Sequence, residues 1–324
     1  MKLKYLVFPL LIIPLTSCNK EIKVDSFYFS TYTEIKLFEG RKSDAEEIDG
    51  IFSKIDKLTD NYLSRDVNNV YRINNTSENI EIDPELYDLL SLTFSSDLAS
   101  LNYFNPLCGS LSKKWKNSLK NHEILDEITI NSELEKMNST TLEFLGDNTV
   151  KRNGEAEIDL GAVVKGYALD KAKEYLDGKE FKKYLIDAGS SSILLGEKNG
   201  GKEFKVKVSD LNETYLMLKN CVVSTSSYSS QKVEIDGKNY SHIINPITGS
   251  ALNENDAVIV ISDKGYLGDI LSTAFINESV DSIKALEQQF NVKTIVVKNN
   301  EIAYKNDGIE VTNKWKKHLE MTSF

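Results

Sequence analysis

A tight turn that opens into a helix is predicted at Asp159-Leu-Gly-Ala-Val-Val-Lys165-Gly-Tyr-Ala-Leu-Asp170. Gly161 lets the backbone approach a ligand closely, and the free amides at the start of a helix favour a bound phosphate group. Lys165, one turn into the helix, would add a positive charge beside that phosphate. A glycine between a strand and a helix is also ordinary connection chemistry. The stretch therefore indicates a ligand site only in combination with other segments.

The segments around this turn predict strands and helices that mix without strict alternation. Residues 158–160 are predicted to end a strand, and the apolar spacing over 163–176 predicts the helix. Apolar and polar residues alternate over 27–38 as in a strand, whereas 45–61 and the segment after Pro84 have helical spacing. Further strands are predicted at 183–187, 192–195, 204–208, 214–218, 222–224, 232–235, 257–261, 294–297 and 301–304, and further helices at 131–137, 267–275 and 280–289. A hairpin is predicted after residue 137, and Asn153-Gly154 is typical of a two-residue turn. The pattern predicts an α+β, or mixed α/β, fold.

The N-terminus has the features of a bacterial lipoprotein signal peptide. A positively charged start precedes an apolar run over 5–15 that is too short to span a bilayer. The run ends in Leu15-Thr16-Ser17-Cys18, which resembles a lipobox, the cleavage motif whose cysteine becomes acylated. We therefore expect removal of residues 1–17, lipidation of Cys18 and a polar tether over 18–25. The expected location is the extracytoplasmic side of a bacterial cell membrane, held there by the lipid anchor.

Charge and cysteine usage argue against several classes of protein. The chain of 324 residues has a formal net charge of -10, which repels nucleic acid, so no nucleic-acid partner is expected. Cys108 and Cys221 stand among apolar or small residues, and neither belongs to a Cys-x-x-Cys pair. Zinc binding and thiol redox chemistry therefore lack support. Two buried thiols and one disulfide are both compatible with the sequence.

His242 is the histidine best placed for catalysis. It stands between a strand predicted over 239–244 and the turn Asn245-Pro246-Ile-Thr-Gly249, a position that suits a side chain facing a cleft. The ordinary pKa of histidine lies near neutrality, so the imidazole can move protons there. The alternative is a structural histidine whose hydrogen bonds brace the turn.

A hard oxygen set is predicted on the helix over 267–275. Asp269 and Thr273 are four residues apart and share one helix face, with Ser272 beside them. Carboxylate and hydroxyl oxygens suit Mg²⁺ rather than zinc or copper and leave positions for water and phosphates. Alternatively, Asp269 is an acid that only caps a helix.

Two runs of hydroxyl residues, 187–192 and 224–230, follow predicted strands. Neither matches a Gly-x-Ser-x-Gly elbow, a P-loop or a dinucleotide-binding motif. Their hydroxyls and amides are better suited to line a polar pocket.

Together, these motifs resemble those of the ApbE-type FAD:protein FMN transferase family. The family pattern contains Asp-Leu-Gly-Gly-x-Ala-Lys-Gly-Tyr-Ala-x-Asp, then Gly-Gly, Thr-Ser-Gly-x-Tyr, His-Ile-x-Asp-Pro-x-Thr-Gly and Ala-Asp-x-x-x-Thr. The counterparts here follow in the same order and rough spacing, at 159–170, 189–190, 225–228, 242–249 and 268–273. Upstream segments at 63–64, 73–74 and 100–106 extend the resemblance over essentially all of the mature chain.

The resemblance implies an enzyme that transfers FMN from FAD to a threonine hydroxyl of a client protein, with Mg²⁺ as cofactor and AMP as the second product. The client would be an exported redox protein. The implied fold is a single compact domain over 26–324, in which mixed sheets with flanking helices form two lobes around an FAD cleft.

The same resemblance assigns roles to individual residues. His242 would be the base that deprotonates the acceptor threonine. The residues implied to bind the flavin nucleotide are Phe29, Tyr103, Phe104, Asn105, Asp159, Lys165 and Ile244. Those implied to hold Mg²⁺ are Ala162 through its carbonyl group, Asp269, Ser272 and Thr273.

Departures from the family pattern cluster on the flavin side. Ser227 replaces a glycine, Asn245 replaces an aspartate, and Tyr103 adds bulk where a small residue is usual. An aromatic residue expected after Leu63-Ser64 to stack on the flavin ring is replaced by Arg65 or Asp66. Two other activities therefore stay open. One is Mg²⁺-dependent hydrolysis of FAD to FMN and AMP, and the other is flavin binding by a lipoprotein without turnover.

Overall fold

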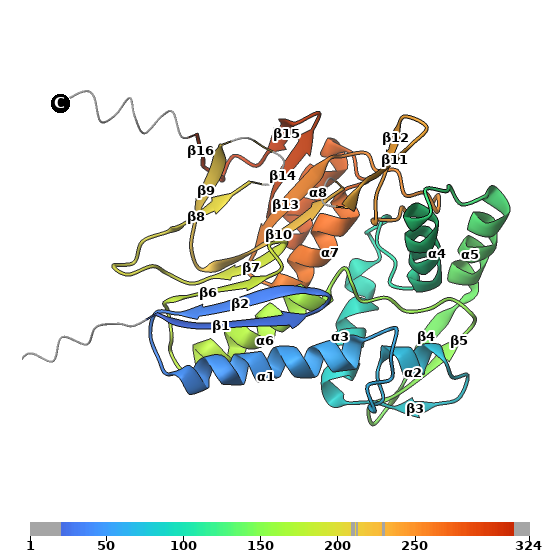
Figure 1. Cartoon of the computed structure of the whole chain (residues 1–324), viewed down its shortest axis with the longest axis horizontal. Coiled ribbons are helices and arrows are strands. Elements are labelled where there is room, and N and C mark those ends of the chain that lie inside the picture. Colours follow the sequence, from blue (N-terminus) through green and yellow to red (C-terminus); the bar gives the residue numbers. More distant parts are fainter. Residues whose placement is uncertain (1–20, 209–210, 212, 229–230, 314–324) are drawn as a thin grey trace, which may run out of the picture.

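An eight-stranded sheet runs through the protein in the order β1-β2-β6-β7-β10-β13-β14-β15 (Figure 1). The computed structural model describes residues 21–208, 211, 213–228 and 231–313. The strands of the sheet are β1 (Ile22–Tyr28), β2 (Thr31–Leu37), β6 (Tyr184–Ala188), β7 (Ser192–Leu195), β10 (Cys221–Ser227), β13 (Ala257–Ser262), β14 (Lys293–Lys298) and β15 (Glu301–Lys305). Every neighbouring pair is antiparallel.

The central strands supply two hydrophobic cores because successive side chains point to opposite faces of a sheet. Leu194, Val222 and Val258 belong to the larger core, whereas the adjacent Leu195 and Val223 belong to the smaller one. The larger core packs against helices α1 (Lys42–Thr59), α6 (Val164–Gly178), α7 (Gly265–Phe275) and α8 (Val280–Phe290). The smaller core includes residues of a three-stranded sheet of β8 (Phe204–Lys207), β9 (Thr214–Leu218) and β16 (Val311–Asn313). The α+β class predicted from the sequence is confirmed.

A second region lies beside one end of the large sheet (Figure 1). It comprises α2 (Val70–Asn74), β3 (Ile80–Glu81), α3 (Pro84–Thr93), the 3-10 helix η1 (Ser96–Leu98), α4 (Gly109–Lys120), α5 (Glu127–Ser139), β4 (Thr141–Gly146) and β5 (Thr149–Asn153). A short hairpin, β11 (Val233–Ile235) with β12 (Lys238–Tyr240), lies next to α4. The buried Trp115 of α4 donates its Nε1–H to the Gly249 carbonyl at 2.7 Å and stacks on Tyr240, with 5.7 Å between ring centres. Helix α4 is thereby fixed to the segment that carries His242.

Helices α6 and α7 pack backbone to backbone. Gly166 and Gly265 face each other, and a Cβ atom on either would collide with the carbonyl group of the other. The Gly166 amide donates to Asp269 Oδ2 at 2.7 Å, and the amides of Gly265 and Tyr266 donate to Asp170 at 2.6 and 2.8 Å. Each helix therefore places a carboxylate on the free amides that begin the other helix, where the helix dipole favours negative charge.

The hairpin β1–β2 replaces the single strand predicted over 27–38. Strand β1 begins at Ile22 and so includes residues 22–25, which the sequence assigned to the tether. The chain turns at Phe29 and Ser30, whose φ angles of 53° and 59° are left-handed. A two-residue turn keeps the apolar and polar alternation in step on both strands, so the sequence pattern shows no break.

Two other local predictions are wrong. Hairpin β4–β5 turns at Asp147 and Asn148, with φ angles of 45° and 55°, rather than at Asn153-Gly154. Gly154 instead lies where the backbone passes close to Thr140, with no room for a Cβ atom. Residues 158–160 form no strand, because the Ile158 amide donates to the Asn74 side chain and the Asp159 amide donates to the Pro106 carbonyl of a loop. The other predicted helices and most of the predicted strands are confirmed, with shifted ends.

The signal peptide predicted over 1–17 and the lipidation site Cys18 lie outside the described residues and stay predictions. None of the helices in the described ranges combines the length and the apolar character needed to cross a membrane.

The two cysteines of the globular part have free thiols. The structure therefore supports two unpaired thiols rather than a disulfide between Cys108 and Cys221. Burial raises the pKa of the Cys108 and Cys221 thiols to about 12, so both are protonated and unreactive at neutral pH.

The contact between α6 and α7 predicts the effect of adding one methyl group. Gly166→Ala would force the Gly265 carbonyl away, and overpacking of this kind typically costs about 1–3 kcal/mol. We expect a lower free energy of unfolding, measured by urea denaturation. Gly178→Ala at the end of the same helix is the matched control. No atom lies within 4 Å of its added Cβ, so this variant should be as stable as the unaltered protein or more so.

Candidate functional site

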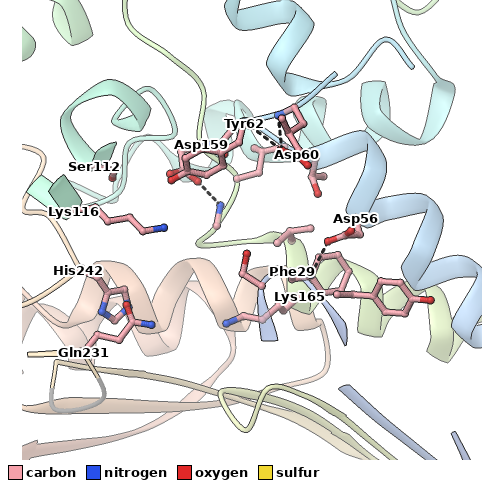
Figure 2. Close-up of a pocket in the computed structure, with 18 of the residues that line it drawn as sticks. Phe29, Asp56, Asp60, Tyr62, Ser112, Lys116, Asp159, Lys165, Gln231 and His242 are labelled. Carbon is pink, nitrogen blue, oxygen red and sulfur yellow. Dashed lines mark hydrogen bonds between the residues drawn. The ribbon is translucent and has the colours of Figure 1, made fainter. Parts of the chain in front are cut away.

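A cleft opens between the tip of hairpin β1–β2, the start of α6 and helix α4. It consists of two adjoining cavities of about 970 and 540 Å³, which are sizes typical of ligand pockets. Phe29, Asp159, Lys165 and His242 line both cavities (Figure 2 shows the larger one). Four residues predicted from three separate segments of the sequence therefore meet in one cleft.

Asp159 is held in the turn that precedes α6. Its amide donates to the Pro106 carbonyl at 2.8 Å, and its Oδ1 accepts from the Gly161 amide at 2.8 Å. Just upstream, the Asn74 side chain exchanges two hydrogen bonds with the backbone of Ile158, at 2.8 and 2.9 Å. Loss of hydration raises the pKa of the Asp159 carboxyl, and the Gly161 amide counteracts that rise. The turn predicted at the start of α6 is present and rigidly held.

Two lysines point into the larger cavity from different walls (Figure 2). Lys165, on the first turn of α6, donates from Nζ to Ser191 Oγ at 2.6 Å. Lys116, on α4, lies 5.3 Å from the centre of the Tyr62 ring. Because the whole chain is acidic, these ammonium groups provide the local attraction that an anionic ligand needs.

His242 faces the cleft, where solvent reaches the ring although protein surrounds it on several sides. Loss of hydration in the cleft, together with the nearby Lys165 ammonium, lowers the pKa of His242 to about 4. The imidazole is therefore neutral at pH 7 and able to accept a proton. Its strand differs from the prediction, because β12 ends at Tyr240 and His242 stands in the irregular segment that follows.

The turn after His242 is braced by another residue. Asn245 Oδ1 accepts from the amides of Ile247 and Thr248 at 2.9 and 3.1 Å, and the Asn245 carbonyl accepts from the Gly249 amide at 2.8 Å. The His242 ring makes no hydrogen bond to another described residue. The alternative interpretation, in which His242 braces the turn, therefore has no support in the described part of the chain.

The four residues predicted to hold a metal lie in two layers. Ala162 and Thr273 line the smaller cavity, whereas Asp269 and Ser272 are buried behind its wall. The hydroxyl of Ser226 joins the layers through hydrogen bonds to Ser272 at 3.0 Å and to Thr273 at 3.2 Å. In the described ranges, no three His, Cys, Asp or Glu side chains are grouped around a common point. The donors assembled here are thus one carboxylate and several neutral oxygens.

Asp269 accepts three hydrogen bonds from its surroundings. Its Oδ1 accepts from the hydroxyls of Ser192 and Ser224 at 2.7 and 2.6 Å, and its Oδ2 accepts from Gly166 of α6. Burial raises the pKa of this carboxyl, and the Lys165 charge and these hydrogen bonds counteract the rise. Asp269 therefore caps a helix, as the alternative interpretation expected, but the amide that donates to it begins the neighbouring helix α6.

The remaining predicted residues line the smaller cavity. They are Tyr103, Phe104 and Asn105, from the loop before α4, and Ile244, from the segment after β12. Asn105 Oδ1 accepts from the Leu107 amide at 2.9 Å, which fixes the loop. The structure thus brings every predicted nucleotide-binding residue to the same cleft.

Sequence reasoning missed an aromatic residue of the larger cavity. Tyr62 lines this cavity and is half exposed, with the ammonium groups of Lys113 and Lys116 at 4.9 and 5.3 Å from its ring centre. The sequence placed Arg65 or Asp66 at the aromatic position, but Arg65 is bound to the Asp60 carboxylate at 2.6 Å. The signal that could have found Tyr62 is its place three residues after the end of α1.

Comparison with known proteins agrees with this geometry. The model of the ApbE family matches residues 29–296. A protein named FAD:protein FMN transferase from Klebsiella pneumoniae is 28% identical over 225 residues, which cover 68% of this chain and 71% of that protein. A protein of the same name from Chlamydia muridarum is 28% identical over 251 residues, which cover 74% and 78%.

Solved structures share the fold. The ApbE protein of Thermotoga maritima superimposes with a TM-score of 0.74 at 22% identity, covering 93% of this chain and 99% of that chain. The flavin transferase ApbE of Vibrio cholerae gives a TM-score of 0.72 at 17% identity, covering 91% and 97%.

The charge around His242 predicts an unusual titration. In the ligand-free protein we expect the ring to protonate near pH 4, below the ordinary histidine value, as measured by NMR of the imidazole nitrogens. Lys165→Met removes a positive charge and should raise this pKa. Lys116→Met, which alters a second lysine of the same cavity, should raise it less. A midpoint near 6.5 in the unaltered protein would contradict the proposed environment.

Proposed function

Because the chain belongs to the ApbE family, we propose that it transfers FMN from FAD to a threonine hydroxyl of a client protein and releases AMP. The observation that carries this proposal is the position of a neutral His242 in the same cleft as Lys165 and Thr273. A proton acceptor, a cation and hard oxygen donors are the groups that phosphoryl transfer requires.

The cleft has separate groups for the two ends of the flavin mononucleotide. The Lys165 ammonium, on the first turn of α6, suits the phosphates. The exposed ring of Tyr62 offers a face on which an isoalloxazine could stack, and Phe29 lies on another wall of the same cavity. Phe29 is fixed at the hairpin tip, where its amide donates to Asp56 Oδ1 at 2.6 Å.

In the proposed reaction, His242 accepts the proton of the acceptor hydroxyl on a ring nitrogen. The hydroxyl oxygen then forms a bond to the phosphorus of the FMN half, and the phosphoanhydride bond breaks. AMP leaves with the bridging oxygen. The His242 ring is unprotonated at neutral pH and can accept this proton, and general-base help of this kind is typically worth about 10²–10⁴-fold in rate.

The oxygen donors fit Mg²⁺. Asp269 Oδ2 accepts one hydrogen bond from the described residues, which leaves a second lone pair, and Ala162 and Thr273 present neutral oxygens on the cavity wall. One carboxylate with few neutral ligands leaves positions for water and phosphate oxygens, as is usual for this ion. When bound, Mg²⁺ would neutralise charge on the phosphates.

An assay with FAD, Mg²⁺ and a carrier protein bearing an exposed Gly-Ala-Thr segment tests the proposal. Covalent flavin fluorescence on the carrier supports transfer. Free FMN and AMP without a labelled carrier would indicate hydrolysis, and intact FAD would indicate binding alone. We expect His242→Ala to slow labelling about 10²–10⁴-fold.

The matched control is His122→Asn, a change at an exposed left-handed position that lines neither cavity, which should leave the labelling rate unaltered. Full labelling by His242→Ala would remove the base from the mechanism. Full labelling in the presence of EDTA would contradict a role for Mg²⁺ in the reaction.

The proposal includes a lipid anchor at Cys18 and a position on the extracytoplasmic side of the membrane. It is supported by the apolar run over 5–15 and the small residues before Cys18. We expect the mature protein to fractionate with membranes and its N-terminal peptide to carry an acylated Cys18 in mass spectrometry. Cys18→Ser should release the protein or leave the precursor uncleaved. An unmodified mature N-terminus would contradict the anchor.

A further inference from the structure

The outward face of hairpin β1–β2 has an aromatic patch at the end nearest the cleft. The patch consists of Phe27 and Tyr32, which pair across the two strands with 5.3 Å between ring centres, edge to face. Their exposed fractions are 59% and 80%. Residues of the same strands that face inward, such as Val24 and Ile35, pack on the hydrophobic core instead. The two aromatic rings thus contribute little to the core.

The rest of this outward face is charged. Lys23 forms ion pairs with Glu34 at 2.6 Å and with Asp25 at 3.1 Å, and Lys36 pairs with Glu34. Charged side chains of this kind protect an edge strand from unwanted pairing, and β1 is the outermost strand of the sheet. The aromatic patch is therefore a local exception on a face that otherwise favours water. An apolar centre with a polar surround is the usual composition of a protein-binding site.

The patch adjoins the reaction cavity. Phe27 lines the same cavity as His242 and Lys165, and the next turn of the chain places Phe29 inside it. Figure 1 shows the tip of hairpin β1–β2 pointing toward α3. An acceptor hydroxyl that reaches His242 must enter this cavity from solvent, so the polypeptide on either side of it must cross the rim.

We propose that the aromatic patch binds the client polypeptide beside its acceptor residue, by contact with an apolar side chain of the client. This inference rests on the proposed function, because it requires a protein acceptor. Exposed aromatic residues supply large contact area with little loss of side-chain freedom, and they dominate the energetics of many interfaces.

The position of the patch favours a polypeptide over a lipid surface. Phe27 lies at the end of β1 opposite Ile22, which is the end that follows the predicted anchor. Five residues of strand separate the two positions, a span of about 17 Å. The ion pairs between them balance two lysines against two carboxylates, so this face has no net positive charge that would attract anionic lipid headgroups.

The test compares acceptor peptides that carry Gly-Ala-Thr with leucine or serine at each of five flanking positions. We expect leucine at one or more positions to lower KM for the unaltered full-length protein. Tyr32→Ser should remove most of that advantage, and Phe27→Ser with Tyr32→Ser should raise KM about tenfold for the best leucine peptide. Tyr32 lines neither cavity, so Tyr32→Ser should leave the Kd for FAD unchanged.

The matched control is Ile302→Ser on β15, the opposite edge of the sheet, which should leave KM unchanged. Peptide Kd, measured by fluorescence anisotropy in the His242→Ala background, reports binding without chemistry. Loss of peptide binding in Tyr32→Ser supports the aromatic patch as a binding site, whether or not flavin is transferred. A complete absence of flavin transfer by the unaltered protein would instead contradict the proposed function. Equal peptide Kd and KM in the patch variants and the control would overturn the inference. Binding to phosphatidylglycerol vesicles is measured on the same variants, and patch variants that bind vesicles less well but bind the peptide normally would also overturn it.

Discussion

The site depends on the contact between α6 and α7, in which a carboxylate of each helix accepts hydrogen bonds from the backbone amides of the other. Asp269 accepts a hydrogen bond from the Gly166 amide of α6, and Asp170 accepts hydrogen bonds from the two amides that begin α7. The exchange is possible only because glycines let the two backbones touch. It fixes the relative position of Lys165, on one helix, and Thr273, on the other. Removing one partner of a buried charge typically costs about 3–5 kcal/mol, so this contact resists distortion strongly.

Much of the cleft could be predicted from the sequence because its main residues stand in short motifs with local causes. The turn at Asp159 and Gly161 follows from glycine chemistry, and the shared face of Asp269 and Thr273 follows from helical spacing. Resemblance to a family then joined these motifs into one site, which periodicity alone could not do. The layering of the metal candidates was not predictable, because helical spacing does not show which oxygens reach a cavity.

The features that escaped prediction depend on contacts between distant segments. Lys116 faces the cavity and contacts Tyr62 because α4 is docked through Trp115 onto Gly249, more than one hundred residues away. The turn at Phe29 was hidden because a two-residue hairpin preserves the alternation of the strands. The role of Ser192 and Ser224 as donors to Asp269 needed the sheet order, which places β7 beside β10.

The hydrogen bonds to Asp269 have a consequence for how the protein assembles. Two hydroxyls and one amide already compensate the buried carboxylate within the polypeptide alone. The polypeptide can therefore fold without a bound cation, in contrast to zinc fingers, which stay unfolded until their ion binds. The site would then be fully formed before the proposed Mg²⁺ and nucleotide bind.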